Sequence, residues 1–372
     1  MNPRSALDKL RHQFDWPLAG VTLALLAIGL VNLYSATRVA PRGLYTQQLV
    51  WLGLGLVGFI VVAAIDYRLY ERIAPLLYGG CIALLGAVLL FGRHINGSRR
   101  WLGIGSFGGQ PSDLVKIGAI LMLAKLLSED PQELRANGWM YNGAALATLV
   151  VPFGLIYLQP DLGTAALVYL IGLSLVLLAP FRWPHRLGAL LVTPAGIALR
   201  LALRHKTSVR SYQMKRLMAF LDPTADPRGA AYHARQSVYA IGSGRWTGKG
   251  WLHGTQNQLQ FLPAHWTDFP FAVWAEEWGL LGGLLLLGCY LFLILWAIGI
   301  SATARDRFGQ LLALGVASLF FWHVVINIGM VTGSLPVVGV TLPLISYGGS
   351  SLLTMMIALG LLMNVSIRRY SY

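Results

Sequence analysis

A long polar stretch of this chain ends in Leu262-Pro263-Ala264-His265-Trp266-Thr267-Asp268-Phe269-Pro270 and leads directly into an apolar run at 271–300. That run is longer than the roughly 20 apolar residues that cross a bilayer as a helix. The polar stretch, about 204–270, is rich in Lys and Arg and has few acids. Polar groups held at a membrane boundary are costly and are therefore usually functional. The sequence predicts a membrane protein whose chemistry lies in one large basic loop, with Asp268 at its end.

The composition of the whole chain supports this class. Of 372 residues, 56% are hydrophobic and 12% are charged, whereas a soluble domain carries about 25% charged residues. The formal charge is +14, and the bases gather in loops between apolar runs. This pattern favours contact with anionic lipid headgroups or a phosphorylated lipid over binding of nucleic acid. Cys81 and Cys289 each lie inside an apolar run, so we expect neither a disulfide framework nor a zinc site.

The predicted fold class is all-α, as a polytopic membrane protein with ten transmembrane helices in a single domain spanning 1–372. The first apolar run is longer than the core of a signal peptide, so we expect it to be retained as a span. The fourth span is the weakest because it is short and contains Lys116 and Lys125, and the large loop of about 204–270 joins the seventh and eighth spans. The predicted spans are 16–35, 47–65, 73–92, 114–128, 141–158, 162–180, 186–203, 271–300, 309–333 and 344–366.

The distribution of Lys and Arg predicts the orientation of the spans. If the N-terminus is cytoplasmic, the short inside segments contain roughly twice as many bases as the short outside segments, as the positive-inside rule expects. Long loops are left out of this comparison, because they cross the membrane largely regardless of charge. We therefore expect both termini in the cytoplasm, and the basic loop and Asp268 outside.

The first outside motif runs from Asn96 to Lys116. Arg99 and Arg100 precede Trp101, a combination that suits a phosphate with a sugar stacked nearby. Ser112 is a candidate cap of the fourth helix, and Asp113 lies one turn before Lys116. Asp113 has two equally good interpretations. It either caps the helix and forms a salt bridge within it, or it belongs to a functional site. For Lys116 we favour a functional role, because an ammonium within a span is expensive without a partner.

Two further motifs lie on the same predicted side. Asp161 follows Gln159-Pro160 and is typical of an N-cap on the sixth helix, so a structural turn is favoured over a site there. The run 339–351 places Ser346, Gly348 and Gly349 before the last helix. Free backbone N–H groups at such a position form a ready anion site. The alternative is a tight-packing turn.

The basic loop itself predicts no nucleotide site. Gly242-Ser243-Gly244 and Gly248-Lys249-Gly250 lack the spacing of a nucleotide P-loop. Asp268 lies beside aromatic residues, and a carboxylate in apolar surroundings holds a proton more tightly, which suits a general base. The alternative for Asp268 is a cap of the eighth helix. Glu276 and Glu277, inside that span, are expected to pair with Arg or Lys from neighbouring segments.

The long motifs of the chain resemble the SEDS family (shape, elongation, division, sporulation), over nearly its whole length. The resemblance rests on Gln159-Pro160-Asp161-Leu162-Gly163-Thr164, Gly248-Lys249-Gly250-Trp251-Leu252-His253-Gly254-Thr255-Gln256, Phe261-Leu262-Pro263, His265-Trp266-Thr267-Asp268-Phe269 and Pro343-Leu344-Ile345-Ser346-Tyr347-Gly348-Gly349-Ser350. The second of these and the run 258–263 are similar to the RodA branch. The chain departs from the family at Asp113, where Glu is usual, and at Trp266 and Pro270, which flank the aspartate. These departures bear on the shape of the pocket more than on the reaction.

The resemblance implies a peptidoglycan glycosyltransferase of the cytoplasmic (inner) membrane that acts in cell elongation. Such enzymes polymerise lipid II on the outer face, and the implied partners are lipid II, a lipid-linked nascent glycan, a class B penicillin-binding protein and other membrane proteins of the elongation complex. The family's essential aspartate matches Asp268. No nucleic acid is expected.

The chemistry of that substrate suggests a mechanism. The lipid diphosphate is already a good leaving group and needs charge neutralisation, so one carboxylate that activates the acceptor hydroxyl is enough for an inverting transfer. We expect Asp268 to be that base, or else the ligand of a divalent cation (Mg or Mn). We expect Arg100, Lys116, Arg216 and Lys249 to hold the diphosphate. The full predicted substrate site comprises Arg100, Trp101, Ser112, Asp113, Lys116, Asp161, Arg210, Arg216, Gln236, Ser243, Lys249, Gln258, His265, Ser346, Gly348 and Gly349.

Two other functions stay open. A flippase for lipid-linked precursors fits ten spans and broken helices, although no chain of acids crosses the predicted core as a proton relay would. A scaffold that only recruits a transpeptidase would tolerate Asp268→Ala.

Overall fold

The computed structural model describes residues 14–38, 43–95, 98–104, 107–129, 132–133, 137–178, 220, 230–262 and 265–369. The predicted seventh span, 186–203, lies outside these residues, as do residues 204–219 and 221–229 of the basic loop, which include Arg210 and Arg216. The prediction of exactly ten spans is therefore not tested. This part of the chain is nearly all-helical, with seven helices that are long and apolar enough to cross a membrane.

The helices lie where the sequence predicts spans, wherever the structure describes the chain. The long apolar helices are α2 (Trp16–Ala36), α3 (Leu44–Ala64), α4 (Tyr67–Phe91), α7 (Gly138–Leu158), α13 (Pro270–Thr303), α14 (Arg307–Val331) and α15 (Gly349–Arg368). Two shorter helices, α5 (Pro111–Leu127) and α8 (Leu162–Leu178), occupy the predicted fourth and sixth positions. The polar loop contributes α11 (Ala230–Ser243) and the single turn α12 (Thr255–Gln258).

Local sequence signals set several of the helix starts. Asp15, Asp66 and Asp306 precede α2, α4 and α14, and each carboxylate accepts a hydrogen bond from a backbone N–H of the first turn, as an N-cap does. Proline is the first residue of α5 and of α13, a position where its missing N–H costs nothing. The last helix begins at Gly349, later than predicted, because the chain before it forms a non-helical loop.

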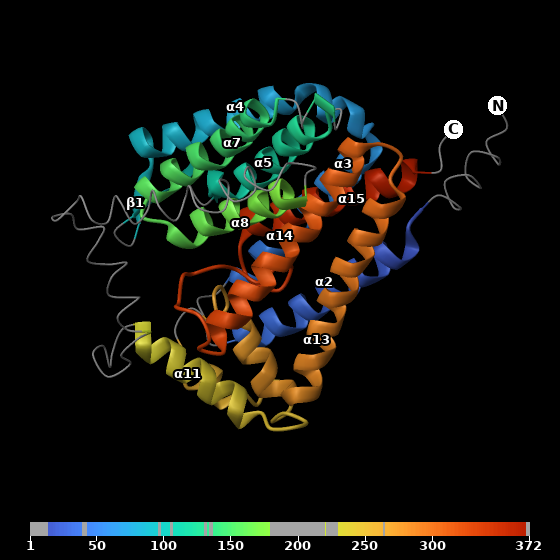
Figure 1. Ribbon diagram of the computed structural model, residues 1–372. Coiled ribbons are helices and arrows are strands. Elements are labelled where there is room, and N and C mark those ends of the chain that lie inside the picture. Colours follow the sequence, from blue (N-terminus) through green and yellow to red (C-terminus); the bar gives the residue numbers. More distant parts are fainter. Residues whose placement is uncertain are drawn as a thin grey trace.

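The core lies around α5, which packs against α4, α7, α8, α14 and α15 (Figure 1). Most side chains of α5, α14 and α15 are buried, whereas few of those of α3 and α4 are buried and many of their large apolar side chains are exposed. Exposed apolar helix faces are expected where a helix borders lipid. The fold therefore places the polar residues of α5 and α14 inside the bundle, protected from the bilayer.

The motif before α5 forms a small sheet that the all-α prediction missed. Strands β1 (Arg93–Ile95), β2 (Ser98–Ile104) and β3 (Phe107–Gly109) pair antiparallel in the order β1-β2-β3. This sheet of two hairpins carries Arg100 and Trp101 to the start of α5.

The predicted continuous span 271–300 is in fact broken near its start. Gly279 in α13 has φ 66° and ψ −163°, a conformation that is essentially restricted to glycine. The residues 244–250, which we call the strap, pair with the backbone on both sides of the break. Lys249 N and Gly250 N donate to the carbonyls of Glu276 and Glu277, and the N–H groups of Leu280 and Leu281 donate to Arg245 O and Trp246 O. The backbone groups freed by the break are thereby satisfied, as burial requires.

Side-chain contacts place α12, which follows the strap, and the end of α15 at opposite ends of α2. At the C-terminal end of α2, Asn257 Nδ2 donates to Ser35 O at 3.0 Å. At its N-terminal end, Asp15 accepts a hydrogen bond from Ser366 Oγ at 2.5 Å and lies 3.6 Å from Arg369 Nη2. The first and last described helices therefore begin and end on the same side of the bundle.

Candidate functional site

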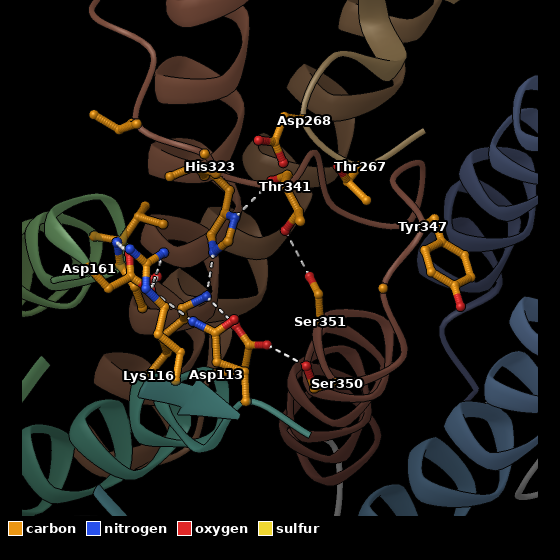
Figure 2. A pocket seen from close by; sticks show the side chains of 18 of the residues that line it. Asp113, Lys116, Asp161, Thr267, Asp268, His323, Thr341, Tyr347, Ser350 and Ser351 are labelled. Carbon is orange, nitrogen blue, oxygen red and sulfur yellow. Dashed lines mark hydrogen bonds and ion pairs between the residues drawn. The ribbon is translucent and has the colours of Figure 1, made fainter. Parts of the chain in front are cut away.

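One cavity of about 310 Å³ opens on the side of the bundle where the strap lies. Its walls come from β2, the N-terminal ends of α5, α8 and α15, the inner face of α14 and the turn before α13. The polar and charged groups at its walls are Arg100, Trp101, Gln110, Asp113, Lys116, Asp161, Thr164, Thr267, Asp268, His323, Thr341, Tyr347, Ser350 and Ser351 (Figure 2).

A buried cluster joins α5, α14 and α15 near the middle of the view in Figure 2. Lys116 Nζ lies 2.8 Å from Asp113 Oδ1 and 3.2 Å from His323 Nε2. The second oxygen of Asp113 accepts from Ser350 Oγ at 2.7 Å. The Lys116 side chain is only 3% exposed. A buried charge is tolerated where it is paired and hydrogen-bonded, and this cluster meets both conditions.

A second ion pair connects the sheet to the start of α8. Arg100 Nη1 lies 3.6 Å from Asp161 Oδ2, and the guanidinium also donates to the carbonyls of Gln159 and Pro160. Asp161 Oδ1 accepts from Thr164 N at 3.2 Å, so Asp161 also caps α8 as predicted. The same residue therefore fills the structural role that the sequence favoured and lines the cavity.

Asp268 lies in the turn that leads into α13 and faces the same cavity. Figure 2 shows Asp268 and Thr267 across the view from Asp113 and Lys116, with Thr341 between them. Asn327 fixes the backbone here, because its Nδ2 donates to Asp268 O at 3.0 Å and to Val340 O at 2.6 Å. The predicted cap role of Asp268 is wrong, because Phe269 is the N-cap residue of α13 and no side chain caps it.

The loop before α15 closes the cavity opposite the sheet. Ser346 Oγ accepts from Leu342 N at 2.7 Å inside this loop, and Gly348 N donates to Gln48 Oε1 at 3.2 Å. Thr341 Oγ1 and Ser351 Oγ, at 2.9 Å, join the two ends of the loop. Gly348 lines the cavity, whereas Gly349 packs on the ring of Trp51 and Ser346 is turned inward.

The charges on the described lining nearly cancel. Two bases, Arg100 and Lys116, face three acids, Asp113, Asp161 and Asp268. Each base is paired with one of these acids. An anionic ligand must therefore share each base with its acid, or bring further positive charge into the cavity.

Several predicted site residues lie away from the cavity. Lys249 Nζ is 2.5 Å from Glu276 Oε1, which confirms the expected base for that buried glutamate but removes Lys249 from the cavity lining. Ser243 Oγ donates to Ala240 O, and Gln258 Nε2 donates to Leu252 O. Gln236 lies on α11, outside the lining.

Ser112 and His265 also differ from their predicted roles. The N-cap of α5 is Gln110, without a capping side chain, and Ser112 is buried within the first turn, so the prediction that Ser112 caps this helix is wrong. His265 is buried between the carbonyls of Leu262 and Ala36, at 2.5 and 2.9 Å from its ring nitrogens. Burial lowers the pKa of His265, and the two carbonyl contacts oppose that shift. It holds the turn before Asp268 against α2.

The sequence analysis did not single out two polar residues of α14. His323 lines the cavity, and Asn327, one turn further along the same apolar span, holds the backbone of Asp268. The signal was present, since polar residues at i and i+4 within a span usually face the bundle interior.

Comparisons with known proteins agree with this architecture. A family model for FtsW, RodA and SpoVE, described as cell cycle protein, matches residues 16–371. The chain belongs to the FtsW/RodA/SpoVE family. The predicted resemblance to SEDS proteins is thereby confirmed.

Relatives of this FtsW/RodA/SpoVE protein match it over nearly its full length. It is 42% identical to the peptidoglycan glycosyltransferase MrdB of Escherichia coli K12. The match extends over 372 residues and covers 99% of this chain and 97% of MrdB. A solved peptidoglycan synthase complex, described as coordinating polymerization and crosslinking, contains a chain with TM-score 0.81 and 34% identity, covering 96% of this chain and 99% of that one. The crystal structure of Thermus thermophilus rod shape determining protein RodA matches with TM-score 0.71 and 32% identity, covering 96% and 98%.

Proposed function

We propose that this protein is a peptidoglycan glycosyltransferase of the RodA branch that polymerises lipid II at the outer face of the cytoplasmic membrane. Full-length relatives that carry this name support the reaction class. The observation that carries the site is that Asp268 shares one cavity with Arg100 and Lys116. A carboxylate and two bases are the groups that this transfer requires.

The reaction assigns a role to each side of the cavity. The acceptor hydroxyl attacks the anomeric carbon of the donor sugar while the bond from that carbon to the diphosphate oxygen breaks. Asp268 takes the hydroxyl proton as general base, and one carboxylate is sufficient for this inverting step. Arg100 and Lys116 hold the diphosphate and stabilise the charge that develops as it leaves.

A divalent cation is the alternative reason for a carboxylate at this place. Among the described residues, no group of three or more His, Cys, Asp or Glu could hold a metal ion. Mg²⁺, however, often binds through one or two carboxylates together with substrate phosphates and water, and Asp268 with the lipid diphosphate fits that pattern. When bound, such an ion would supply positive charge to the leaving diphosphate. Such a cation would add positive charge that the cavity otherwise lacks, because both of its described bases are already paired with acids.

Membrane placement and partners extend this proposal. We place both termini in the cytoplasm, with the cavity outside. The start of α2 and the end of α15 lie together on the side opposite the strap, and the distribution of Lys and Arg favours that side as the cytoplasmic one. We further propose a class B penicillin-binding protein and other elongation-complex membrane proteins as partners. The similarity to a chain of a solved peptidoglycan synthase complex supports a paired assembly.

The decisive experiment compares two Asp→Asn variants of the purified protein. Asp268→Asn keeps the size of the side chain but removes the base, and polymer formation from lipid II should fall by about 10²–10⁴. Asp66→Asn is the matched control, since Asp66 caps α4 at the opposite end of the bundle and Asn caps equally well. Its polymerisation should match that of the wild type. Each protein is assayed with and without Mg²⁺ or Mn²⁺, and its folding is checked by thermal unfolding.

The outcomes separate the candidate functions. Normal polymerisation by Asp268→Asn would refute the assignment of Asp268. A wild type that moves lipid-linked precursor across liposome membranes without making polymer would indicate a flippase, and one that does neither would indicate a scaffold.

A further inference from the structure

His323 is a polar side chain in the middle of an apolar helix, and both of its ring nitrogens are engaged. It is 1% exposed. Its Nδ1 lies 3.1 Å from Thr341 O, and its Nε2 lies 3.2 Å from Lys116 Nζ (Figure 2). The imidazole thus joins α14 to the ammonium on α5 and to the loop before α15.

These two contacts determine the protonation of the ring. A backbone carbonyl can only accept, so Nδ1 carries the proton and donates to Thr341 O. Nε2 then presents a lone pair, which accepts a hydrogen bond from the Lys116 ammonium. His323 therefore acts here as a neutral acceptor, and it holds Lys116 without cancelling its charge.

The contacts of Lys116 leave one donor for a ligand. An ammonium has three N–H groups. One points to Asp113 Oδ1 and one to His323 Nε2. No third acceptor for Lys116 is found in the part of the chain that the structure describes, and Lys116 borders the cavity. The remaining N–H is therefore available to an anionic oxygen that enters there.

The same face of α14 also fixes the opposite wall. Asn327 lies one turn after His323 and donates to the backbone carbonyl of Asp268 at 3.0 Å. The same helix thus holds the ammonium through His323 and, through Asn327, the backbone that carries the Asp268 carboxylate. Catalysis by positioning depends on such fixed separations.

We propose that His323 is a positioning residue, which holds the Lys116 ammonium toward the diphosphate of the lipid-linked donor at a fixed separation from Asp268. This inference rests on the proposed function. It assigns His323 no contact with the reacting atoms, so its effect must pass through Lys116.

Two amide variants separate the two contacts of the ring. The amide of Gln reaches the place of Nε2, whereas the shorter amide of Asn reaches only the place of Nδ1. His323→Gln should therefore keep the hydrogen bond from Lys116, while His323→Asn and His323→Leu lose it. Val325→Ala is the control, since Val325 lies on the same helix with its side chain 38% exposed.

The test measures binding, so that it does not depend on turnover. All variants are made in the Asp268→Asn background, and the dissociation constant of a polyprenyl diphosphate in detergent is measured for each. His323→Asn and His323→Leu should bind about ten-fold or more weakly, as expected when a hydrogen bond to a charged group is lost. His323→Gln and Val325→Ala should bind as the background does. In the protein that keeps Asp268, His323→Asn and His323→Leu should raise KM for lipid II more than they lower kcat.

A double-mutant cycle decides whether the effect passes through Lys116. With Lys116→Met already in place, His323→Leu should have no further effect on the dissociation constant. The proposal would be overturned if His323→Gln, His323→Asn and His323→Leu weakened binding equally, if these effects added to that of Lys116→Met, and if they followed a loss of thermal stability. His323 would then be a purely structural histidine. If the wild type made no polymer while this binding pattern held, the proposed function would fail and the positioning of Lys116 would stand.

Discussion

Asp161 performs two tasks with one carboxylate, as a cap of α8 and as the counter-ion of Arg100. The two tasks differ in what they need from the side chain. Capping requires an oxygen that accepts from a backbone N–H, which Asn supplies as well as Asp. Pairing with a guanidinium requires the negative charge.

Substitutions at Asp161 should therefore separate helix stability from charge. Asp161→Ala removes the cap and should lower the free energy of unfolding by about 1 kcal/mol more than Asp161→Asn does. Thermal or denaturant unfolding in detergent measures this difference. Equal stability of the two variants would show that the contact with Thr164 N contributes nothing to α8.

At the scale of the element, the break in α13 determines where the strap can lie. A Cβ at Gly279 would collide with the backbone of Trp246, Thr247 and Gly248. Behind this contact, Glu276 is fully buried and binds Lys249 and Thr255. The strap is therefore held to α13 by backbone pairing and by one buried ion pair, only a short distance in sequence before Asp268.

Substitution of Gly279 by Ala should displace the strap. The positive φ alone costs of the order of 1–3 kcal/mol for a residue with a Cβ, and the collision adds to it. Gly288→Ala, on the same helix, meets nothing within 4 Å and should be neutral or slightly stabilising, because Ala is the better helix former. Thermal unfolding and limited proteolysis of the strap compare the two. A Gly279→Ala protein with wild-type stability and an intact strap would contradict the described backbone.

At the scale of the whole molecule, the buried polar networks lie at the two ends of the helix bundle. The strap region and the cavity lie at one end of the bundle, and the start of α2 meets the end of α15 at the other. Buried polar networks at both ends tie helices that are distant in sequence, so the apolar faces of α3 and α4 are left for lipid.

Cysteine labelling of intact cells tests this orientation. In a chain whose Cys81 and Cys289 are replaced by Ala, Thr247→Cys lies in the exposed strap and Ala302→Cys at the far end of α13, also exposed. With the outer membrane opened, a membrane-impermeant maleimide should label position 247 at once and position 302 only after the inner membrane is permeabilised. The reverse pattern would invert the proposed topology.

Features encoded by local spacing could be predicted from the sequence. The apolar runs gave the helices, Asp161 was expected to cap α8, and the spacing of Asp113 and Lys116 indicated an ion pair. Each of these depends on residues within one helical turn of one another or on the composition of a single run.

Features that depend on packing could not be predicted. His323 meets Lys116 across 207 positions of sequence, and no spacing rule brings those residues together. The sheet of β1, β2 and β3 was missed because two of its strands have only three residues and the seven residues of β2 lack a clear alternation of apolar and polar residues. From the sequence, Lys249 is predicted to bind the diphosphate. The structure pairs it with Glu276 instead, and only the packing of the strap against α13 brings these two residues together.

The two internal ion pairs of the cavity have a consequence for turnover. Asp113 and Asp161 neutralise Lys116 and Arg100, so neither of the two bases described at the cavity stands as a bare cation at the edge of a medium of low dielectric constant. On the proposed function, an arriving diphosphate shares each base with its carboxylate, because Lys116 keeps its contact with Asp113 while its remaining N–H meets the ligand. We expect this sharing to weaken the grip of the two bases on the diphosphate, and thereby to shorten the time for which the spent carrier stays bound.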